Sequence, residues 1–172
     1  IRLSLVGSEM CIRDRVWTTD ITYIPMHKGL LYLYAIIDVH SCYIVGWGAL
    51  FNLESENAIE VFERAIATYG VPEIINSDQG SQYTCKEWIE TLKTHKIQIS
   101  MDGRGRCRDN AWIERFWRTL KENYVYLNPD NNGREMIAGI ADYISYYNNI
   151  RVHSGNGRMT LKRAYEKLPS AT

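Results

Sequence analysis

Residues 17–48 read WTTDITYIPMHKGLLYLYAIIDVHSCYIVGWG, and this stretch decides the class of fold. It holds three runs rich in β-branched and aromatic residues: Trp17–Pro25, Leu30–Asp38 and Cys42–Gly48. Turn residues at 27–29 and 39–41 separate these runs. Such runs are typical of β-strands, and short turns join antiparallel neighbours. The stretch therefore predicts an antiparallel meander of three strands.

Beyond this meander the sequence alternates between strand and helix patterns. Apolar residues recur at helical spacing over 54–69 and from Met136 to Tyr147. Further helices are predicted over Lys86–His95, 110–124 and Leu161–Leu168, and further strands over Glu73–Ser77 and Ile97–Met101. The order β-β-β-α-β-α-β-α predicts an α/β domain in which three antiparallel strands precede two more.

The chain divides into three unequal parts. Residues 1–15 show little periodicity and begin without Met, so we expect a non-native or fragmentary leader or, alternatively, an ordered lead-in to the first strand. Residues 16–168 are predicted to form one domain, because no repeat or long linker interrupts them, and residues 169–172 form a tail. The 45 % hydrophobic and 12 % aromatic content argues against a disordered chain.

Charge and cysteine content narrow the class of protein. The net charge is zero, but residues 1–100 carry 8 basic and 12 acidic groups, whereas residues 101–172 carry 12 basic and 8 acidic. A nucleic-acid surface is therefore expected in the C-terminal part. The 4 cysteines form no Cys-x-x-Cys pair, so we expect neither a disulfide framework nor structural zinc. No apolar run approaches the roughly 20 residues of a membrane span, so we expect no membrane partner.

Three acidic residues lie in separate short motifs. Asp20 lies in the first predicted strand, Asp78 follows the fourth, and Glu114 lies on the helix over 110–124, with 35 residues (114 minus 78, minus one) between the last two. Phosphodiester transfer with two divalent ions needs carboxylates that converge from different elements, and these three meet that need. The alternative for any single Asp at a strand end is a turn or cap residue. We assign Asp38 and Asp102 to that class.

The motifs around the three acids are WTTDITY at 17–23, NSDQGSQY at 76–83 and DNAWIERFW at 109–117. With their spacing they resemble the DDE signature of transposases and retroviral integrases. Three further stretches strengthen the resemblance: LYAIIDVHSCYIVGW at 33–47, ISMDGRG at 99–105 and YNNIRVH at 147–153. From Val16 to about Lys167 the chain is similar to the catalytic domain of bacterial insertion-sequence transposases of the type-three family, the group closest to retroviral integrases.

The resemblance implies a ribonuclease-H-like fold, with a five-stranded mixed sheet flanked by helices. It implies that Asp20, Asp78 and Glu114 are catalytic and bind Mg²⁺ or Mn²⁺, with two ions per site when DNA is bound. The implied reaction cleaves a DNA strand at a transposon end, and the freed 3′ hydroxyl then attacks target DNA without a covalent protein–DNA intermediate.

The implied partners are double-stranded DNA, at the transposon ends and at the target, and further copies of the chain in a synaptic complex. The expected location is the bacterial cytoplasm, at the nucleoid. The family carries a helix-turn-helix region upstream of this domain, and we expect it to be missing from this chain.

Residues near the three acids are candidates for DNA contact. Lys121 shares a helix face with Glu114 and Arg118, and it matches a basic residue that the family uses near the terminal base pairs. The alternative is a solvated surface Lys or an ion-pair partner. Arg118 is a further candidate for DNA contact, and its alternative is an ordinary surface Arg. Gln79, Gly80 and Ser81 are predicted either to bind DNA through their amides or to form a structural turn. The remaining candidates are Arg104 and Arg106 as phosphate ligands, Asn110 as a phosphate ligand or, preferably, a helix cap, and Tyr147, Asn148, Arg151 and His153 as an accessory cluster.

Three functions stay open at the level of sequence. The first is an active DDE transposase catalytic domain. The second is a non-catalytic transposase fragment that folds and binds DNA or self-associates. The third is a ribonuclease-H-type nuclease that acts on RNA–DNA hybrids. Metal binding and cleavage of DNA discriminate the first two, and a comparison of hybrid with DNA duplex substrates tests the third.

Overall fold

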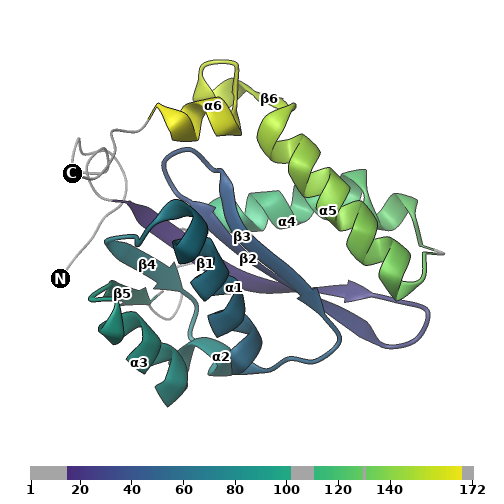
Figure 1. The fold of residues 1–172 in the computed structure, drawn as a ribbon. Coiled ribbons are helices and arrows are strands. Elements are labelled where there is room, and N and C mark those ends of the chain that lie inside the picture. Colours follow the sequence, from purple (N-terminus) through teal and green to yellow (C-terminus); the bar gives the residue numbers. More distant parts are fainter. Residues whose placement is uncertain (1–14, 102–110, 130, 168–172) are drawn as a thin grey trace.

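The computed structural model of the protein describes residues 15–101, 111–129 and 131–167. Its centre is a five-stranded sheet with the strand order β3-β2-β1-β4-β5 (Figure 1). The strands are β1 (Val16–Pro25), β2 (Leu30–Asp38), β3 (Ile44–Leu50), β4 (Ile74–Ser77) and β5 (Gln98–Met101). β1, β2 and β3 are antiparallel neighbours, whereas β4 runs parallel to β1 and β5 parallel to β4. The mixed sheet confirms the predicted α/β class.

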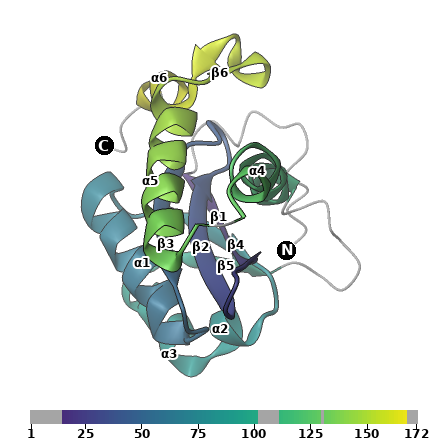
Figure 2. The same cartoon turned by 90° about the vertical axis from the view of Figure 1, so that its right-hand side faces the viewer.

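Helices cover both faces of this sheet. α1 and α3 lie on one face, and α4 lies on the other (Figure 2). The helices are α1 (Ser55–Tyr69), α2 (Ser81–Thr84), α3 (Lys86–Thr94), α4 (Ala111–Asn123), α5 (Gly133–Asn149) and α6 (Leu161–Glu166). Two 3-10 turns, η2 (Val125–Leu127) and η3 (Ser154–Asn156), and a small ribbon of β6 (Val152–His153) and β7 (Met159–Thr160) complete the described chain. None of the described helices has the length and apolar character needed to cross a membrane.

Two glycines on β3 allow α1 to pack closely against the sheet. Gly46 and Gly48 lie on the same face of the strand because side chains alternate along it. A Cβ atom at Gly48 would lie 2.7 Å from Cγ2 of Val61, and one at Gly46 would lie 3.0 Å from Cβ of Ala65. Both partners are on α1, so the glycines set the distance between helix and sheet.

The outer edge of β3 is held by α5 through Asn148. The Asn148 amide donates to the backbone oxygen of Ile44 at 3.0 Å, and its Oδ1 accepts the Ile44 amide N–H at 3.1 Å. Both residues are buried, so the backbone of Ile44 is satisfied at an edge where no further strand of the described residues pairs with β3.

The structure differs from the sequence-based prediction in its shortest elements. The third strand begins at Ile44 rather than Cys42, because a turn brings the Asp38 amide to the Tyr43 oxygen at 2.9 Å and Cys42 adopts φ 60°. Helix α2 and the β6–β7 ribbon were not predicted, and α6 ends at Glu166. The predicted leader up to residue 14 and the tail 169–172 lie outside the described residues, so the domain limits stay predictions.

Candidate active site

The register of β1 and β4 places two of the three acids side by side. In this parallel pair Thr19 lies opposite Ser77, and the next residue on each strand is an aspartate, Asp20 on β1 and Asp78 just past β4. Parallel strands keep equal steps along their axes. The two aspartates therefore hold equivalent positions along neighbouring parts of the chain, Asp20 on β1 and Asp78 one residue past β4.

A buried hydrogen-bond chain ties the segment after Asp78 back to β1. The Tyr83 hydroxyl lies 3.0 Å from Oγ1 of Thr19, and this Oγ1 donates to the Ala35 backbone oxygen at 3.1 Å. Since the Thr19 proton is used on Ala35, Tyr83 donates to Thr19. Tyr83 is 1 % exposed and packs edge-on against Trp88. The contact locks α2, and with it the turn at Asp78, against the strand that carries Asp20.

Gly80 shapes the turn that follows Asp78. Its amide N–H donates to Oδ1 of Asp78 at 3.0 Å, and its carbonyl accepts the amides of Tyr83 and Thr84 at 3.0 and 3.1 Å. A Cβ atom at this position would lie 3.0 Å from the same Oδ1. Gly80 therefore has a structural role in the turn. Gln79 and Ser81 are exposed beside it, and their contact with DNA stays a prediction.

Asp20 faces the helix on the opposite side of the sheet from Tyr83. Its Oδ2 accepts a hydrogen bond from Nε1 of Trp117 on α4 at 2.9 Å. Burial raises the pKa of Asp20 from 3.8 to about 6, the bonds from Trp117 and from the Ile21 backbone lower it, and the negative charges of Asp78 and Glu114 raise it. The negative charges of Asp78 and Glu114 therefore both act on Asp20, in the middle of β1.

Glu114 lies in the first turn of α4 and is exposed. Oxygen ligands of this kind suit Mg²⁺ and Mn²⁺. Within the described ranges, however, no group of three or more His, Cys, Asp or Glu side chains is arranged closely enough to hold a metal ion. The predicted triad thus has the donor chemistry for a divalent ion, and the strand register holds its two aspartates in adjacent positions.

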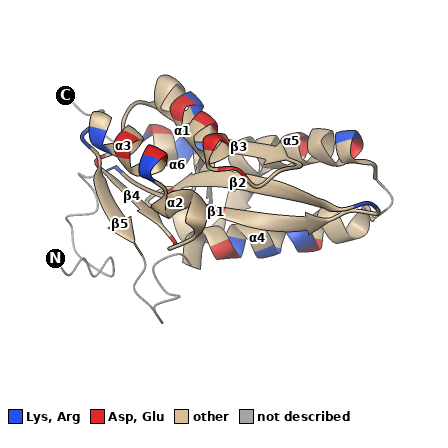
Figure 3. Ribbon diagram, turned by 90° about the horizontal axis from the view of Figure 1, so that it is seen from below, with Lys and Arg blue, Asp and Glu red and all other residues tan. Residues whose placement is uncertain are grey.

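Basic residues follow Glu114 along α4. Lys121 is partly buried, which lowers its pKa, while the negative charge of Asp20 raises it, so Lys121 lies within the field of the site. Arg118 is exposed one turn earlier. Figure 3 shows Lys, Arg and acidic residues along α4, in contrast to the largely uncharged strands of the sheet. The predicted ligands Arg104, Arg106 and Asn110 lie outside the described residues.

The residues of the predicted accessory cluster lie close together at the end of α5. The Arg151 guanidinium lies 5.5 Å from the ring centre of Tyr147, and Nε2 of His153 lies 3.3 Å from the Tyr147 backbone oxygen. Tyr147 in turn packs against Phe116 of α4, with ring centres 5.1 Å apart. These contacts connect α5 to the helix of Glu114, whereas Asn148 is used at the edge of β3. An accessory role of the four residues in catalysis stays a prediction.

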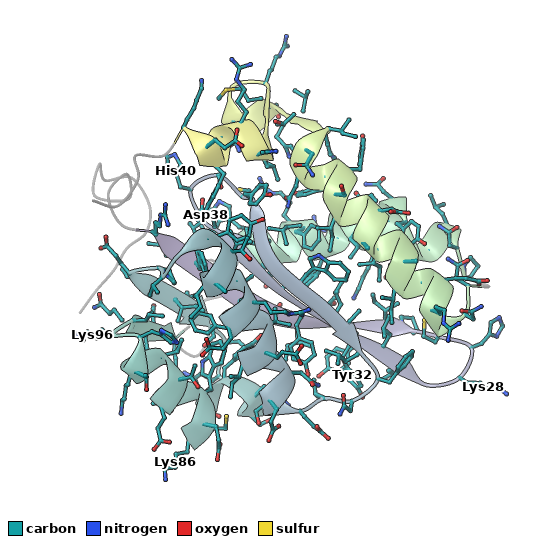
Figure 4. All side chains as sticks on the ribbon, viewed as in Figure 1. Lys28, Tyr32, Asp38, His40, Lys86 and Lys96 are labelled. Atoms are coloured by element: carbon teal, nitrogen blue, oxygen red, sulfur yellow. The ribbon has the colours of Figure 1, made fainter. Side chains whose placement is uncertain are left out.

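Asp38 has the structural role that the sequence predicted. Its Oδ1 accepts the Ser41 backbone N–H at 2.8 Å and the Ser41 hydroxyl at 2.5 Å, which closes the turn between β2 and β3. Figure 4 shows Asp38 and His40 at one end of the sheet, far from Lys28 at the tip of the β1–β2 hairpin.

The sequence did not predict the two side chains whose hydrogen bonds hold the elements of the site together, Trp117 and Tyr83. Both stand inside the quoted motifs, and Trp117 lies three residues after Glu114, hence on nearly the same helix face. That spacing was the available signal. It did not specify a partner on β1, because the partner is 97 residues away in sequence.

Comparisons with known proteins agree with this arrangement. Models of the integrase core domain match residues 12–107 and 95–160. The chain is 38 % identical over 145 residues to the transposase for insertion sequence element IS904 of Lactococcus lactis, covering 83 % of this chain and 57 % of that protein. It is 31 % identical over 150 residues to transposase InsF for insertion sequence IS3A of Escherichia coli, covering 86 % of this chain and 52 % of InsF. The chain thus spans about half the length of these curated relatives.

Solved structures share the fold. The catalytic core domain of HTLV-2 integrase, determined with magnesium in a dimeric form, aligns with a TM-score of 0.69 at 20 % identity, covering 89 % of this chain and 97 % of that domain. A chain of the simian T-cell lymphotropic virus intasome, solved with a PP2A regulatory subunit, gives 0.77 at 21 % identity, covering 92 % of this chain and 58 % of that one. The predicted ribonuclease-H-like fold is therefore confirmed. Family match, relatives and fold together show that the chain belongs to the integrase core domain family, in the branch that resembles transposases of the type-three insertion sequences.

Proposed function

We propose that this chain is the catalytic core of a bacterial insertion-sequence transposase, a DDE-type polynucleotidyl transferase. The observation that carries the proposal is the placement of Asp20 beside Asp78, which each follow the paired residues Thr19 and Ser77. The helix of Glu114 is in turn bonded to Asp20 through Trp117. The transposase relatives support the same activity.

Asp20, Asp78 and Glu114 would hold Mg²⁺ or Mn²⁺, with two ions when DNA is bound. Such ions generate a nucleophilic oxygen and stabilise the leaving oxygen during in-line displacement. The proposal requires the three carboxylates to close in on one another, because the described residues contain no ready-made group of three. The two aspartates give that closure a fixed starting point, since their positions follow from the strand register.

The proposed reaction has two steps at phosphorus. A water oxygen first attacks the phosphodiester at a transposon end, the bond to the 3′ oxygen breaks, and that oxygen leaves as a hydroxyl. The 3′ hydroxyl then attacks a phosphodiester of target DNA, whose own 3′ oxygen leaves. Lys121 and Arg118 would bind the DNA backbone beside the acids, as would Arg104 and Arg106.

The proposed partners follow from the chemistry. Two transposon ends must be processed together, so we infer a homo-oligomer assembled on double-stranded DNA. A reaction on chromosomal DNA places the protein in the bacterial cytoplasm, at the nucleoid.

The test is Mn²⁺-dependent nicking of supercoiled plasmid by the purified chain, an assay that needs no knowledge of the terminal repeats. Asp78→Asn is expected to lower the rate by about 1000-fold, which corresponds to about 4 kcal/mol of activation free energy. The matched control is Asp142→Asn on the exposed side of α5, which should retain the native rate. Equal nicking by Asp78→Asn and the native chain would refute the proposal.

A second candidate is a non-catalytic fragment that binds DNA or self-associates. It is favoured because the described residues hold no ready-made group of three metal-ligating side chains. Calorimetric titration with Mn²⁺ separates the two. Metal binding without nicking on any DNA substrate would favour the non-catalytic fragment. Nicking of an RNA–DNA hybrid in preference to DNA duplex would instead favour a ribonuclease-H-type nuclease.

A further inference from the structure

Three tryptophans in the described chain are buried, and their indole N–H groups differ in whether they have a hydrogen-bond partner. Nε1 of Trp17 and Nε1 of Trp88 are buried without a hydrogen-bond partner. Nε1 of Trp117, whose side chain is 6 % exposed, donates to the Asp20 carboxylate at 2.9 Å. An indole can only donate, and a carboxylate is among the strongest acceptors available to it. Among these three indoles, Trp117 is the one that donates to a residue of the candidate site.

The bond joins the two parts of the candidate site. Asp20 stands on β1, whereas Trp117 stands on α4, 97 residues further along the chain. Glu114 precedes Trp117 by three residues and Lys121 follows it by four, so all three project from neighbouring positions on one face of the helix. The hydrogen bond at the centre of that face therefore adds a polar contact between α4 and β1 to the apolar contacts that seat the helix.

Packing around Trp117 keeps its indole in this orientation. The ring lies against Phe116, with ring centres 5.1 Å apart, and Phe116 lies against Tyr147 of α5. Phe116, like Ile113 and Leu120, is fully buried on α4. The donor is thus held by apolar contacts on one side and directed at Asp20 on the other.

We propose that Trp117 is a positioning residue, whose indole N–H orients the Asp20 carboxylate and holds α4, the helix that carries Glu114, in place against β1. This inference rests on the proposed function, since the orientation of Asp20 matters if that carboxylate binds a metal ion. A carboxylate oxygen has more than one acceptor site, so Oδ2 can keep the indole bond and also face a ligand. Hydrogen bonds behind a ligating carboxylate orient it and raise metal affinity.

The first experiment is Trp117→Phe, which keeps an aromatic ring and removes the donor. The affinity of the purified chain for Mn²⁺, measured by calorimetry, is expected to fall by about 10- to 100-fold. The rate of plasmid nicking should fall at limiting Mn²⁺ and recover in part at high Mn²⁺, with the KM for DNA unchanged. A structural defect would not give this pattern, because it would lower activity at every metal concentration.

The matched control is Trp88→Phe, the same chemical change at a fully buried indole that has no partner. It removes the same atoms from the core and should leave Mn²⁺ affinity within about twofold of the native value. Equal Mn²⁺ affinity in Trp117→Phe and the native chain would overturn the proposal, and so would an equal loss in both variants.

A second measurement needs no variant. In the native chain the indole N–H of Trp117, followed by nuclear magnetic resonance, should exchange slowly with solvent both without metal and after Mg²⁺ is added. Rapid exchange in either state would overturn the proposal even if Trp117→Phe failed to fold. Failure of the proposed function can be distinguished from failure of this inference, because in the former case Asp78→Asn would nick DNA like the native chain.

Discussion

Two regions of the molecule bring acidic residues to the candidate site, and they do so by different means. At the junction of β1 and β4, Asp20 and Asp78 are placed by the hydrogen-bonded register of two parallel strands. On α4, Glu114 is placed by side chains, through the apolar face of the helix and the bond from Trp117 to Asp20. A register depends on many backbone bonds, so a single substitution leaves it in place. A helix seated by side chains is displaced more readily by a substitution, so the position of Glu114 is expected to be more sensitive to mutation than the positions of the two aspartates.

The largest effect is expected from Asp20→Asn, which removes the charge at the contact between the two regions. The raised pKa of about 6 means that the folded chain holds the Asp20 proton more tightly than the unfolded chain does. This contribution stabilises the fold below about pH 4 and is lost as the pH rises through about 6. At pH 7 without metal, Asn should therefore raise the free energy of unfolding by about 2 kcal/mol. Nicking should fall by about 1000-fold.

Urea unfolding with a chelator, at pH 7 and pH 4, checks this prediction. The gain should be present at the higher pH and absent at the lower one. Asp142→Asn on the surface of α5 is the control, and it should change stability by less than about 0.5 kcal/mol at either pH. A destabilised Asp20→Asn at pH 7 would show that the bond from Trp117 to a charged Asp20 outweighs the cost of burying that charge.

A smaller effect is expected from Tyr83→Phe, which removes the hydroxyl that ties α2 to Thr19. The loss should be about 1 kcal/mol of stability, since one buried hydrogen bond disappears while Thr19 keeps its bond to Ala35. Nicking should stay within about threefold of the native rate, because the register of β1 and β4 still places both aspartates. The exposed Tyr126→Phe is the control for loss of a tyrosine hydroxyl.

The result of this change bears on the comparison itself. If Tyr83→Phe abolished nicking while costing only about 1 kcal/mol of stability, the junction would depend on a side-chain contact as much as α4 does. In that case the β1–β4 junction and α4 would not differ in how they place their acidic residues.

Sequence patterns predicted what backbone periodicity controls. Strand β2 has the predicted bounds Leu30–Asp38, and the three acids lie on the predicted elements. The four-residue helix α2 and the two-residue strands β6 and β7 were not predicted, because they are too short to show a period, whereas the short strands β4 and β5 were predicted from their apolar residues. The structural use of Asn148 at the edge of β3 also escaped prediction, since an amide that bonds a strand backbone depends on how a distant helix packs.

The candidate site shows the same division. Its acids and their spacing were readable from the motifs, because the chemistry needs carboxylates from different elements. The hydrogen bonds that hold the site together could not be predicted. Trp117 and Asp20, like Tyr83 and Thr19, are distant in sequence and come into contact only in the folded chain. A tryptophan within a helix predicts a buried side chain. The partner of its N–H can be predicted only when the position of the sheet beneath the helix is known.

The smallest effect is expected from Lys121→Ala, which tests whether DNA is bound by α4 rather than by the β1–β4 junction. Lys121 lies on the helix face of Glu114, in the field of Asp20. Loss of one phosphate contact should weaken DNA binding by a few-fold and reduce the salt slope of the binding constant by about one. The matched control is Lys86→Ala on α3, on the other face of the sheet, where the lysine is exposed and pairs with Glu90 at 3.6 Å. Its salt slope should equal that of the native chain. Fluorescence anisotropy over a range of salt concentrations measures both slopes, and equal slopes in the two variants would remove α4 from the DNA-binding surface.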